Sequence, residues 1–223
     1  MTERLPLFPL GMVLFPGLVL PLNVFEERYR LMVQELLLLP EDERQFGVVC
    51  IREGREVGAD GVTALHDVGC TARLRTVQEQ DDGRYELVAV GSERFRLDAL
   101  HQDRPYFTGE VTWLGDEPGD AAEADVLDRA VRRGFADYLA AVAEATGGEV
   151  ASPDLPDEPL VLSHLVGATV LLDLAERQAL LAEPDGVARL RAELRVLRRE
   201  AVLLRTLRSA PAPDLARVPF SPN

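Results

Sequence analysis

The residues of this chain that could carry out chemistry are few and scattered. Its three histidines, His66, His101 and His164, lie far apart, and none has a cysteine or carboxylate at the spacing of a metal site. Ser163 and His164 are neighbours, but on a helix adjacent side chains point about 100° apart and cannot form a nucleophile–base pair with each other. The sequence therefore predicts no catalytic residue, no metal site and no cofactor.

The basic residues exclude further kinds of chemistry. All 24 of them are arginine, and the sequence contains no lysine. A Walker A phosphate loop, a Ser–Lys protease dyad and a Schiff-base enzyme each need a lysine side chain. We therefore expect that this chain is not an enzyme and that it neither hydrolyses ATP nor cleaves casein.

The acidic composition limits the partners of the protein. The formal net charge is −14, so the average field of the molecule repels nucleic acid and anionic membranes. Cys50 and Cys70 are the only cysteines, far from the dense framework of a small secreted domain, and we interpret both as reduced thiols on strands. These features favour a cytoplasmic protein that binds neither nucleic acid nor membrane.

The uncharged stretch from Leu5 to Phe25 could be mistaken for a signal peptide or a membrane span. Pro6, Pro9, Pro16 and Pro21 would interrupt a helix repeatedly, so buried strands separated by turns fit this stretch better.

Short β-type runs separated by turn residues fill the front half and predict a barrel or sandwich. The expected strands are Leu5–Phe8, Met12–Phe15, Leu18–Leu22, Phe46–Arg52, Ala64–Gln78, Tyr85–Gly91, Phe95–Leu100 and Tyr106–Leu114. Asp82-Gly83 predicts the turn of a hairpin from Cys70 to Val90 with a well-defined register. The spacing of Gly54 to Gly58 predicts a turn rather than a phosphate loop. One helix, from about Val24 to Leu39, is expected against the barrel.

The composition changes after Leu114, where helical patterns begin. An apolar stripe predicts a first helix that ends at Gly147-Gly148, and Asp173 with Glu176 forms a capping box that opens another. Pro184-Asp185-Gly186 starts a long last helix with an apolar seam. We therefore predict an α+β fold with three parts: a PUA-like β-barrel subdomain with one helix (1–115), an α-helical bundle (116–210) and a Pro-rich tail (211–223).

Arginines are concentrated on the last helix, which is locally basic on an acidic protein. They are Arg189, Arg191, Arg195, Arg198, Arg199, Arg205 and Arg208. The preferred interpretation is that they pair with the acidic first helix of the back half and its loop. The alternative is a patch for an anion or a partner protein.

The N-terminal residues resemble a known family. The turn Phe15-Pro16-Gly17, followed by Leu20-Pro21-Leu22 and a helix, is similar to the opening of the substrate-binding N-domain of Lon proteases. The segments at 67–73, 82–85, 91–96 and 105–106 continue the resemblance in order. It implies a PUA-like barrel and a helical bundle that engage unfolded or tagged polypeptides. The chain has no room for the ATPase and peptidase domains, so it resembles a freestanding form of this N-domain.

We therefore expect a non-catalytic polypeptide-binding module that acts as an adaptor in protein quality control. Its expected partners are unfolded or misfolded polypeptide and a protease or chaperone. The candidate binding residues are apolar side chains in the cleft between the two halves, namely Met12, Phe15, Phe107 and Trp113. Two alternatives stay open: a small hydrolase with an unrecognised site, such as a triad with Asp157 or Asp173, and a PUA-like RNA-binding module.

Overall fold

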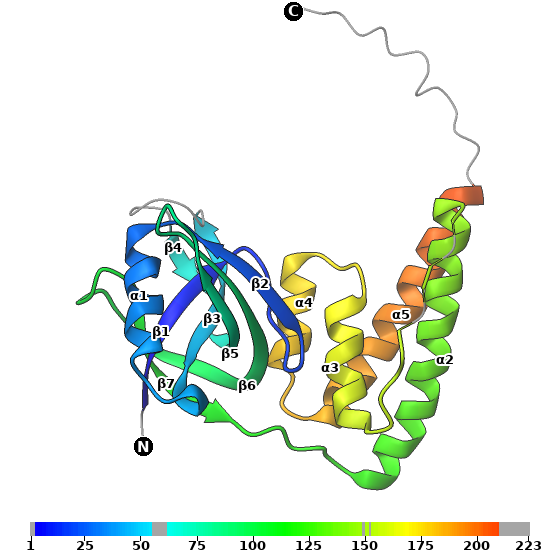
Figure 1. The fold of residues 1–223 in the computed structure, drawn as a ribbon. Helices are drawn as coiled ribbons and strands as arrows, with labels where there is room; N and C mark the ends of the chain where they lie inside the picture. Colours follow the sequence, from blue (N-terminus) through cyan, green and yellow to red (C-terminus); the bar gives the residue numbers. More distant parts are fainter. Residues whose placement is uncertain (1–2, 55–61, 149, 152, 210–223) are drawn as a thin grey trace, which may run out of the picture.

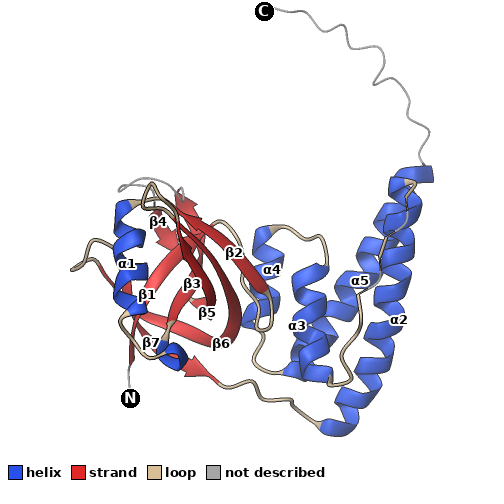
Figure 2. Ribbon diagram, viewed as in Figure 1, coloured by secondary structure: helices blue, strands red, loops and turns tan. Residues whose placement is uncertain are grey.

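A computed structural model describes residues 3–54, 62–148, 150–151 and 153–209. The expected Pro-rich tail (211–223) and most of the expected turn at Gly54–Gly58 lie outside the described residues. Strands occupy the front half and helices most of the back half (Figure 2), which confirms the α+β prediction. Among the described helices, none is both long and apolar enough to cross a membrane.

The strands of the front half form a closed barrel (Figure 1). Their bounds are β1 Glu3–Leu10, β2 Val19–Val24, β3 Gln45–Gly54, β4 Val62–Leu65, β5 Val68–Glu79, β6 Tyr85–His101 and β7 Thr108–Leu114. The order β1-β7-β6-β5-β3 returns to β1 through a parallel β1–β3 pairing, while the other four pairings of this ring are antiparallel. β2 adds to β6, and β4 adds to β3.

The expected division into strands is wrong at two places. The run Ala64–Gln78 is divided into β4 and β5, whereas Tyr85–Gly91 and Phe95–Leu100 are parts of one bent strand, β6. At the bend the β5–β6 register shifts, and the Thr71 hydroxyl bonds with both the N–H and the carbonyl of Glu93. This hydroxyl satisfies backbone groups that the bulge leaves without a ladder hydrogen bond, so the polar residues there do not end the strand. The hairpin turn at Gly83 is confirmed, with a φ of +78°.

The segment Met12–Phe15 is not a strand. The residues that follow it, not the segment itself, bond to β6: Gly91 N–H donates to the Leu18 carbonyl, and the Gly91 carbonyl accepts from Gly17 N–H. The segment alternates like a strand because Leu14 points into the barrel core, while Val13 and Phe15 pack against the helical half. The apolar pattern of this segment therefore arises from packing in the barrel core and against the helical half, not from membership of a sheet.

Helix α1 (Glu27–Leu37) covers the barrel but is shorter than the expected Val24–Leu39 helix. Val24 instead completes β2, where it pairs with Tyr85. The buried face of α1 carries Tyr29, which stacks on Phe8 of β1 with ring centroids 4.0 Å apart. A 3-10 turn, η1 (Glu41–Glu43), then leads into β3.

The helical half contains α2 (Ala121–Thr146), α3 (Pro159–Thr169), α4 (Leu174–Ala182) and α5 (Gly186–Ser209). As expected, Gly147 ends α2 in a left-handed conformation, and the Asp173 side chain caps α4 by accepting from Glu176 N–H. α2 and α5 lie side by side and run in the same direction (Figure 1), and α3 packs against both. Their shared core is built on Val131, Phe135, Leu162, Val166, Leu190 and Leu197.

Candidate functional site

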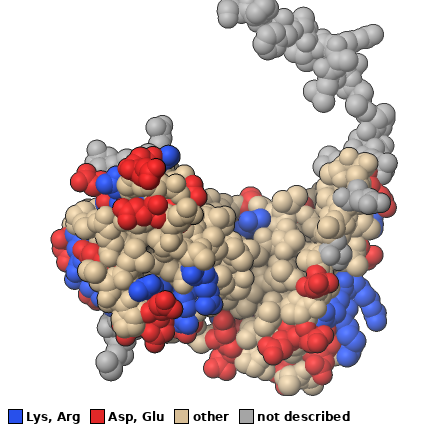
Figure 3. Space-filling view, in the orientation of Figure 1, with Lys and Arg blue, Asp and Glu red and all other residues tan. Residues whose placement is uncertain are grey.

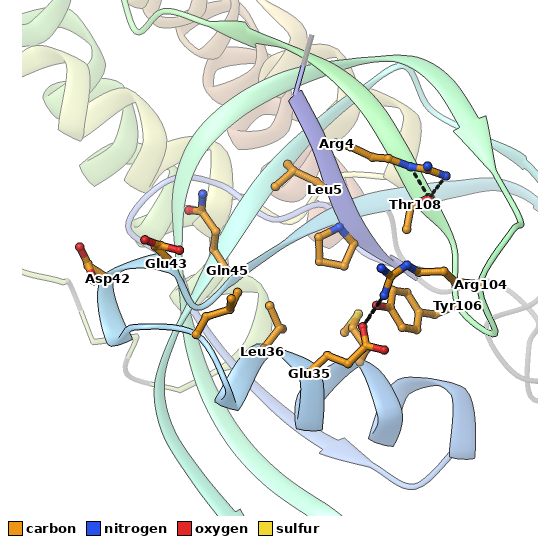
Figure 4. A pocket seen from close by; sticks show the side chains of 13 residues that line it. Arg4, Leu5, Glu35, Leu36, Asp42, Glu43, Gln45, Arg104, Tyr106 and Thr108 are labelled. Atoms are coloured by element: carbon orange, nitrogen blue, oxygen red, sulfur yellow. Dashed lines mark hydrogen bonds and ion pairs between the residues drawn. The ribbon is translucent and has the colours of Figure 1, made fainter.

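A pocket of about 630 Å³ opens between α1 and the place where β1 and β3 diverge (Figure 4). Strand pairing between β1 and β3 begins at Leu7 opposite Gly47, although the same register would place Leu5 opposite Gln45. Both Leu5 and Gln45 line the pocket instead. We call this space the barrel–α1 pocket.

One edge of β1 is open at this pocket. Residues Glu3–Pro6 pair with β7 on one side, but on the other side they have no strand partner among the residues that the structure describes. Unpaired N–H and C=O groups at a strand edge can accept an added strand from another polypeptide. Pro6 has no N–H, so the open edge offers the Arg4 N–H and carbonyl oxygens, in addition to the side chains of the pocket.

The floor of the barrel–α1 pocket is apolar, and its rim is charged. Leu5, Pro6, Met32, Leu36 and Leu39 supply the apolar surface. The core of the barrel fixes most of this floor, because Leu5, Met32 and Leu36 are buried.

Two arginines on the rim are held in place by partners distant in sequence. Arg104 donates to Glu35 Oε2 at 2.5 Å and to the Tyr106 hydroxyl at 2.9 Å, and the same hydroxyl donates to Glu35. Burial, together with the Glu35 hydrogen bond, raises the pKa of Tyr106, so its hydroxyl keeps its proton at neutral pH. Arg4 donates to Thr108 Oγ1 at 3.0 Å from Nε and 2.9 Å from Nη2 (Figure 4).

The opposite rim carries Asp42 and Glu43, which form no ion pair with the described part of the chain. With Glu35 they give the rim an acidic excess over Arg4 and Arg104. An apolar floor between strand edges and a polar rim can hold an extended peptide segment.

The four apolar residues expected to bind polypeptide do not share one surface. Phe15 is fully buried (0% exposed) between the barrel and helices α3–α5, and Phe107 is buried in a barrel cluster. Trp113 lies partly exposed at the edge of that cluster, edge-on to Phe95 with ring centroids 6.4 Å apart. Met12 is partly buried against the main barrel core. At Phe15 the expected cleft is packed shut, and a binding role for the four residues stays a prediction.

The contact between the halves is instead built around a buried arginine. Arg94 on β6 is 1% exposed and donates to Asp116 Oδ1 at 2.8 Å, in the segment between β7 and α2. It also donates to the carbonyls of Leu181 and Glu183, at 2.8 and 2.7 Å. Burial alone would raise the pKa of Asp116, but His164 and Arg94 outweigh it and lower this pKa to about 2.

A second buried charge lies behind this contact. Arg189 on α5 donates to the Leu180 carbonyl and to Ser163 Oγ, both at 3.1 Å. Burial, and then the charge of Arg94, lowers the pKa of Arg189 to about 10, so it stays protonated at neutral pH. Burial also raises the pKa of Glu193 well above its usual range. These groups are enclosed by protein, which is typical of a structural network rather than a reaction site.

His164, its neighbour Ser163 and the two cysteines lie in surroundings typical of structural rather than catalytic residues. His164 lies 3.4 Å from Asp116 Oδ2, and burial lowers its pKa despite that neighbour. Ser163 donates its hydroxyl proton to the Leu160 carbonyl at 2.7 Å, so it is not activated by a base. Cys50 and Cys70 are free and buried on strands, as expected. No group of three or more potential metal ligands occurs in the part of the chain that the structure describes.

Sequence reasoning did not single out the rim residues of the barrel–α1 pocket as a site. The pairs that form the rim are 69 positions apart for Glu35–Arg104 and 104 apart for Arg4–Thr108. No local pattern marks such a pair, because only closure of the barrel brings its members together.

The family model and the curated relatives that this chain matches all belong to one family. A family model described as the ATP-dependent protease La (LON) substrate-binding domain matches residues 4–199. Lon protease 2 of Syntrophobacter fumaroxidans is 28% identical over 194 residues, which cover 85% of this chain and 24% of that protein. Lon protease of Escherichia coli K12 is 26% identical over 206 residues, covering 91% of this chain and 26% of that protein. The chain thus spans about a quarter of the length of these curated relatives.

Solved structures show the same fold. The crystal structure of a Lon N-terminal domain protein from Xanthomonas campestris has a TM-score of 0.60 and 26% identity, covering 86% of this chain and 98% of that one. The N-terminal domain of a Mycobacterium avium complex Lon protease has a TM-score of 0.58, covering 90% of this chain and 98% of that one. The latter is only 16% identical and supports the fold alone.

Proposed function

The chain belongs to the LON substrate-binding domain family, and on this premise we propose that it binds unfolded polypeptide segments in the barrel–α1 pocket without cleaving them. The observation that carries the proposal is the open edge of β1 at Arg4–Pro6, next to an apolar floor. We call the bound polypeptide the client. An extended strand of the client gains backbone hydrogen bonds from this edge and buries alternate side chains on the floor of the pocket. We further propose that the protein acts in the cytoplasm as a quality-control adaptor that passes clients to a protease or chaperone.

The proposed mode of binding explains why selectivity would be loose. Backbone hydrogen bonds to a strand edge do not depend on the client's side chains, and an apolar floor distinguishes side chains mainly by size. Folded proteins have few free extended segments, so they would be excluded. The pocket therefore suits clients that are misfolded or not yet assembled.

Two adjacent leucines provide a matched test of the site. Leu39 lines the pocket and is 39% exposed, whereas Leu38 does not line it and is 86% exposed. We expect Leu39→Ser to weaken binding of a reduced, unfolded client by about 3- to 10-fold, the equivalent of roughly 1 kcal/mol of lost apolar burial. Leu38→Ser should leave the affinity unchanged. Fluorescence anisotropy of a labelled client measures both.

The outcome separates pocket binding from general adhesion. If apolar surface of any kind held the client, the more exposed Leu38 would matter more than Leu39. Equal effects of the two substitutions, or an effect of Leu38→Ser alone, would contradict the proposed site. Absence of any client binding by the unaltered chain would contradict the proposed function.

A further inference from the structure

A stripe of arginines follows one face of α5. Arg191, Arg195, Arg198, Val202 and Arg205 recur at intervals of three or four residues, so at 3.6 residues per turn they lie within about 40° of one line along the helix. This line runs beside α2, because Arg191 pairs with Glu123 and Arg205 donates to the Asp137 carbonyl.

α2 contributes a matching stripe. Val126, Ala130 and Arg133 lie between Glu123 and Asp137 at the same helical intervals, and therefore on the same side of α2. α3 packs against both helices, and the buried face of α2 is directed towards this shared core. We call the outward surface of the two stripes the arginine ridge.

Most arginines of the ridge are free to bind an anionic group of another molecule. Arg133, Arg195 and Arg198 are exposed and form no ion pair with any residue that the structure describes. Arg199, next along α5, points elsewhere and pairs with Glu176 of α4 at 2.5 Å. The expectation that the α5 arginines pair with the first helix of the back half is thus met by Arg191 but not by Arg195 or Arg198.

The ridge is a positive region on an acidic molecule. Figure 3 shows blue side chains gathered over α2, next to red surfaces. At physiological ionic strength charges are screened beyond about 8 Å, so a bound segment responds to the ridge more than to the net charge of −14. Two exposed aliphatic side chains, Val126 (58%) and Val202 (61%), interrupt the charge.

We propose that the arginine ridge binds an acidic polypeptide segment that also carries aliphatic side chains. The distance from Arg191 to Arg205 along α5 is about 21 Å, which a helical segment of about 16 residues would cover. Such a segment can place carboxylates at Arg195 and Arg198 and aliphatic groups on Val126 and Val202. A nucleic-acid duplex is uniformly anionic and offers no aliphatic groups, and it would press phosphates against Glu123 and Asp137. The mixed surface therefore favours polypeptide.

The probe for this proposal is a labelled peptide of about 16 residues with glutamates and leucines at helical spacing. We expect it to bind with an affinity that falls as salt is raised, while a peptide with Gln in place of every Glu binds at least about 10-fold more weakly. The double substitution Arg195→Gln with Arg198→Gln should weaken the acidic peptide by about 10-fold or more. Client binding by the barrel–α1 pocket should stay unchanged, because the ridge lies on other elements.

The matched control removes two other exposed arginines. Arg52 and Arg75 lie on barrel strands and have no ion-pair partner among the described residues, so Arg52→Gln with Arg75→Gln changes the net charge equally. Equal loss of peptide affinity in both double variants would overturn the proposal, since net charge alone would then explain binding. So would undetectable binding of the acidic peptide, equal binding of the Gln peptide, or tighter binding of a DNA duplex that the ridge substitutions abolish.

Discussion

The Arg94 guanidinium joins the two halves of the molecule through hydrogen bonds at 2.7–2.8 Å to Asp116, Leu181 and Glu183. A buried guanidinium loses its hydration, so each remaining N–H needs an acceptor. The carbonyls at the end of α4 provide two such acceptors, and Asp116 provides the opposite charge. Since burial keeps His164 neutral at pH 7, Arg94 is the charged group that holds the Asp116 carboxylate at that pH.

The ionisation of Asp116 makes the stability of the folded protein depend on pH in the acid range. Its pKa is lowered from the usual 3.8 to about 2, so its charged form stabilises the folded state. The contribution is complete above about pH 4, is lost as the pH falls through about 2, and amounts to roughly 2 kcal/mol. We expect Asp116→Asn to lower the free energy of unfolding by about this amount at pH 7. The difference between the two proteins should shrink between pH 4 and pH 2 in urea titrations, and a constant difference would contradict this role.

Elements with a regular apolar period were predictable from the sequence, whereas residues that serve two cores were not. α2 ends, and α4 and α5 begin, close to the residues expected from the sequence, because capping residues act locally. Met12–Phe15 alternates as a strand would, yet Leu14 packs in the barrel core while Val13 and Phe15 pack against the helical half. The rim of the barrel–α1 pocket was missed for a related reason, since its residues meet only after the barrel closes.

Gly167 on α3 marks the place where this segment meets the helices. A Cβ atom there would lie 2.8 Å from Phe15 Cε1, and that ring is enclosed on all sides. We expect Gly167→Ala to destabilise the protein by about 1–3 kcal/mol despite the higher helix propensity of alanine.

Gly134 on α2 is the matched control for this substitution. A Cβ atom there would lie 3.4 Å from Leu194 Cδ1, an ordinary contact. Gly134→Ala should therefore be neutral or stabilising by up to about 1 kcal/mol. Thermal unfolding of the two variants distinguishes them, and equal effects would contradict the tight approach of Phe15 to α3.

The whole molecule combines a barrel that carries the pocket with helices that carry the arginine ridge. The division into subdomains at 1–115 and 116–210 is our proposal, and the junction at Arg94 and Phe15 would couple them. Trp113 is the only tryptophan and lies on β7, so its fluorescence reports on the barrel, while helical circular dichroism reports mainly on the other half.

We expect the two signals to change together in the unaltered protein during urea unfolding. Arg94→Met leaves the carbonyls of Leu181 and Glu183 without their donor, which should weaken the junction by roughly 2–4 kcal/mol. The two unfolding midpoints should then separate. If they shift equally and stay coincident, the halves form one cooperative unit and the subdomain proposal is wrong.

Hydrogen exchange of the chain with and without an unfolded client tests the central claim most directly, because it reports where the client lies without any substitution. Leu7 N–H already donates to the Phe107 carbonyl on the β7 side, and Pro6 has no N–H, so strand addition at the open edge of β1 predicts slower amide exchange at Arg4. Further protection is expected at 35–45 and 104–108 around the pocket. Protection confined to the junction near Phe15, or to α2 and α5, would contradict binding in the barrel–α1 pocket. Unchanged exchange throughout, under conditions that saturate the chain with client, would contradict it as well.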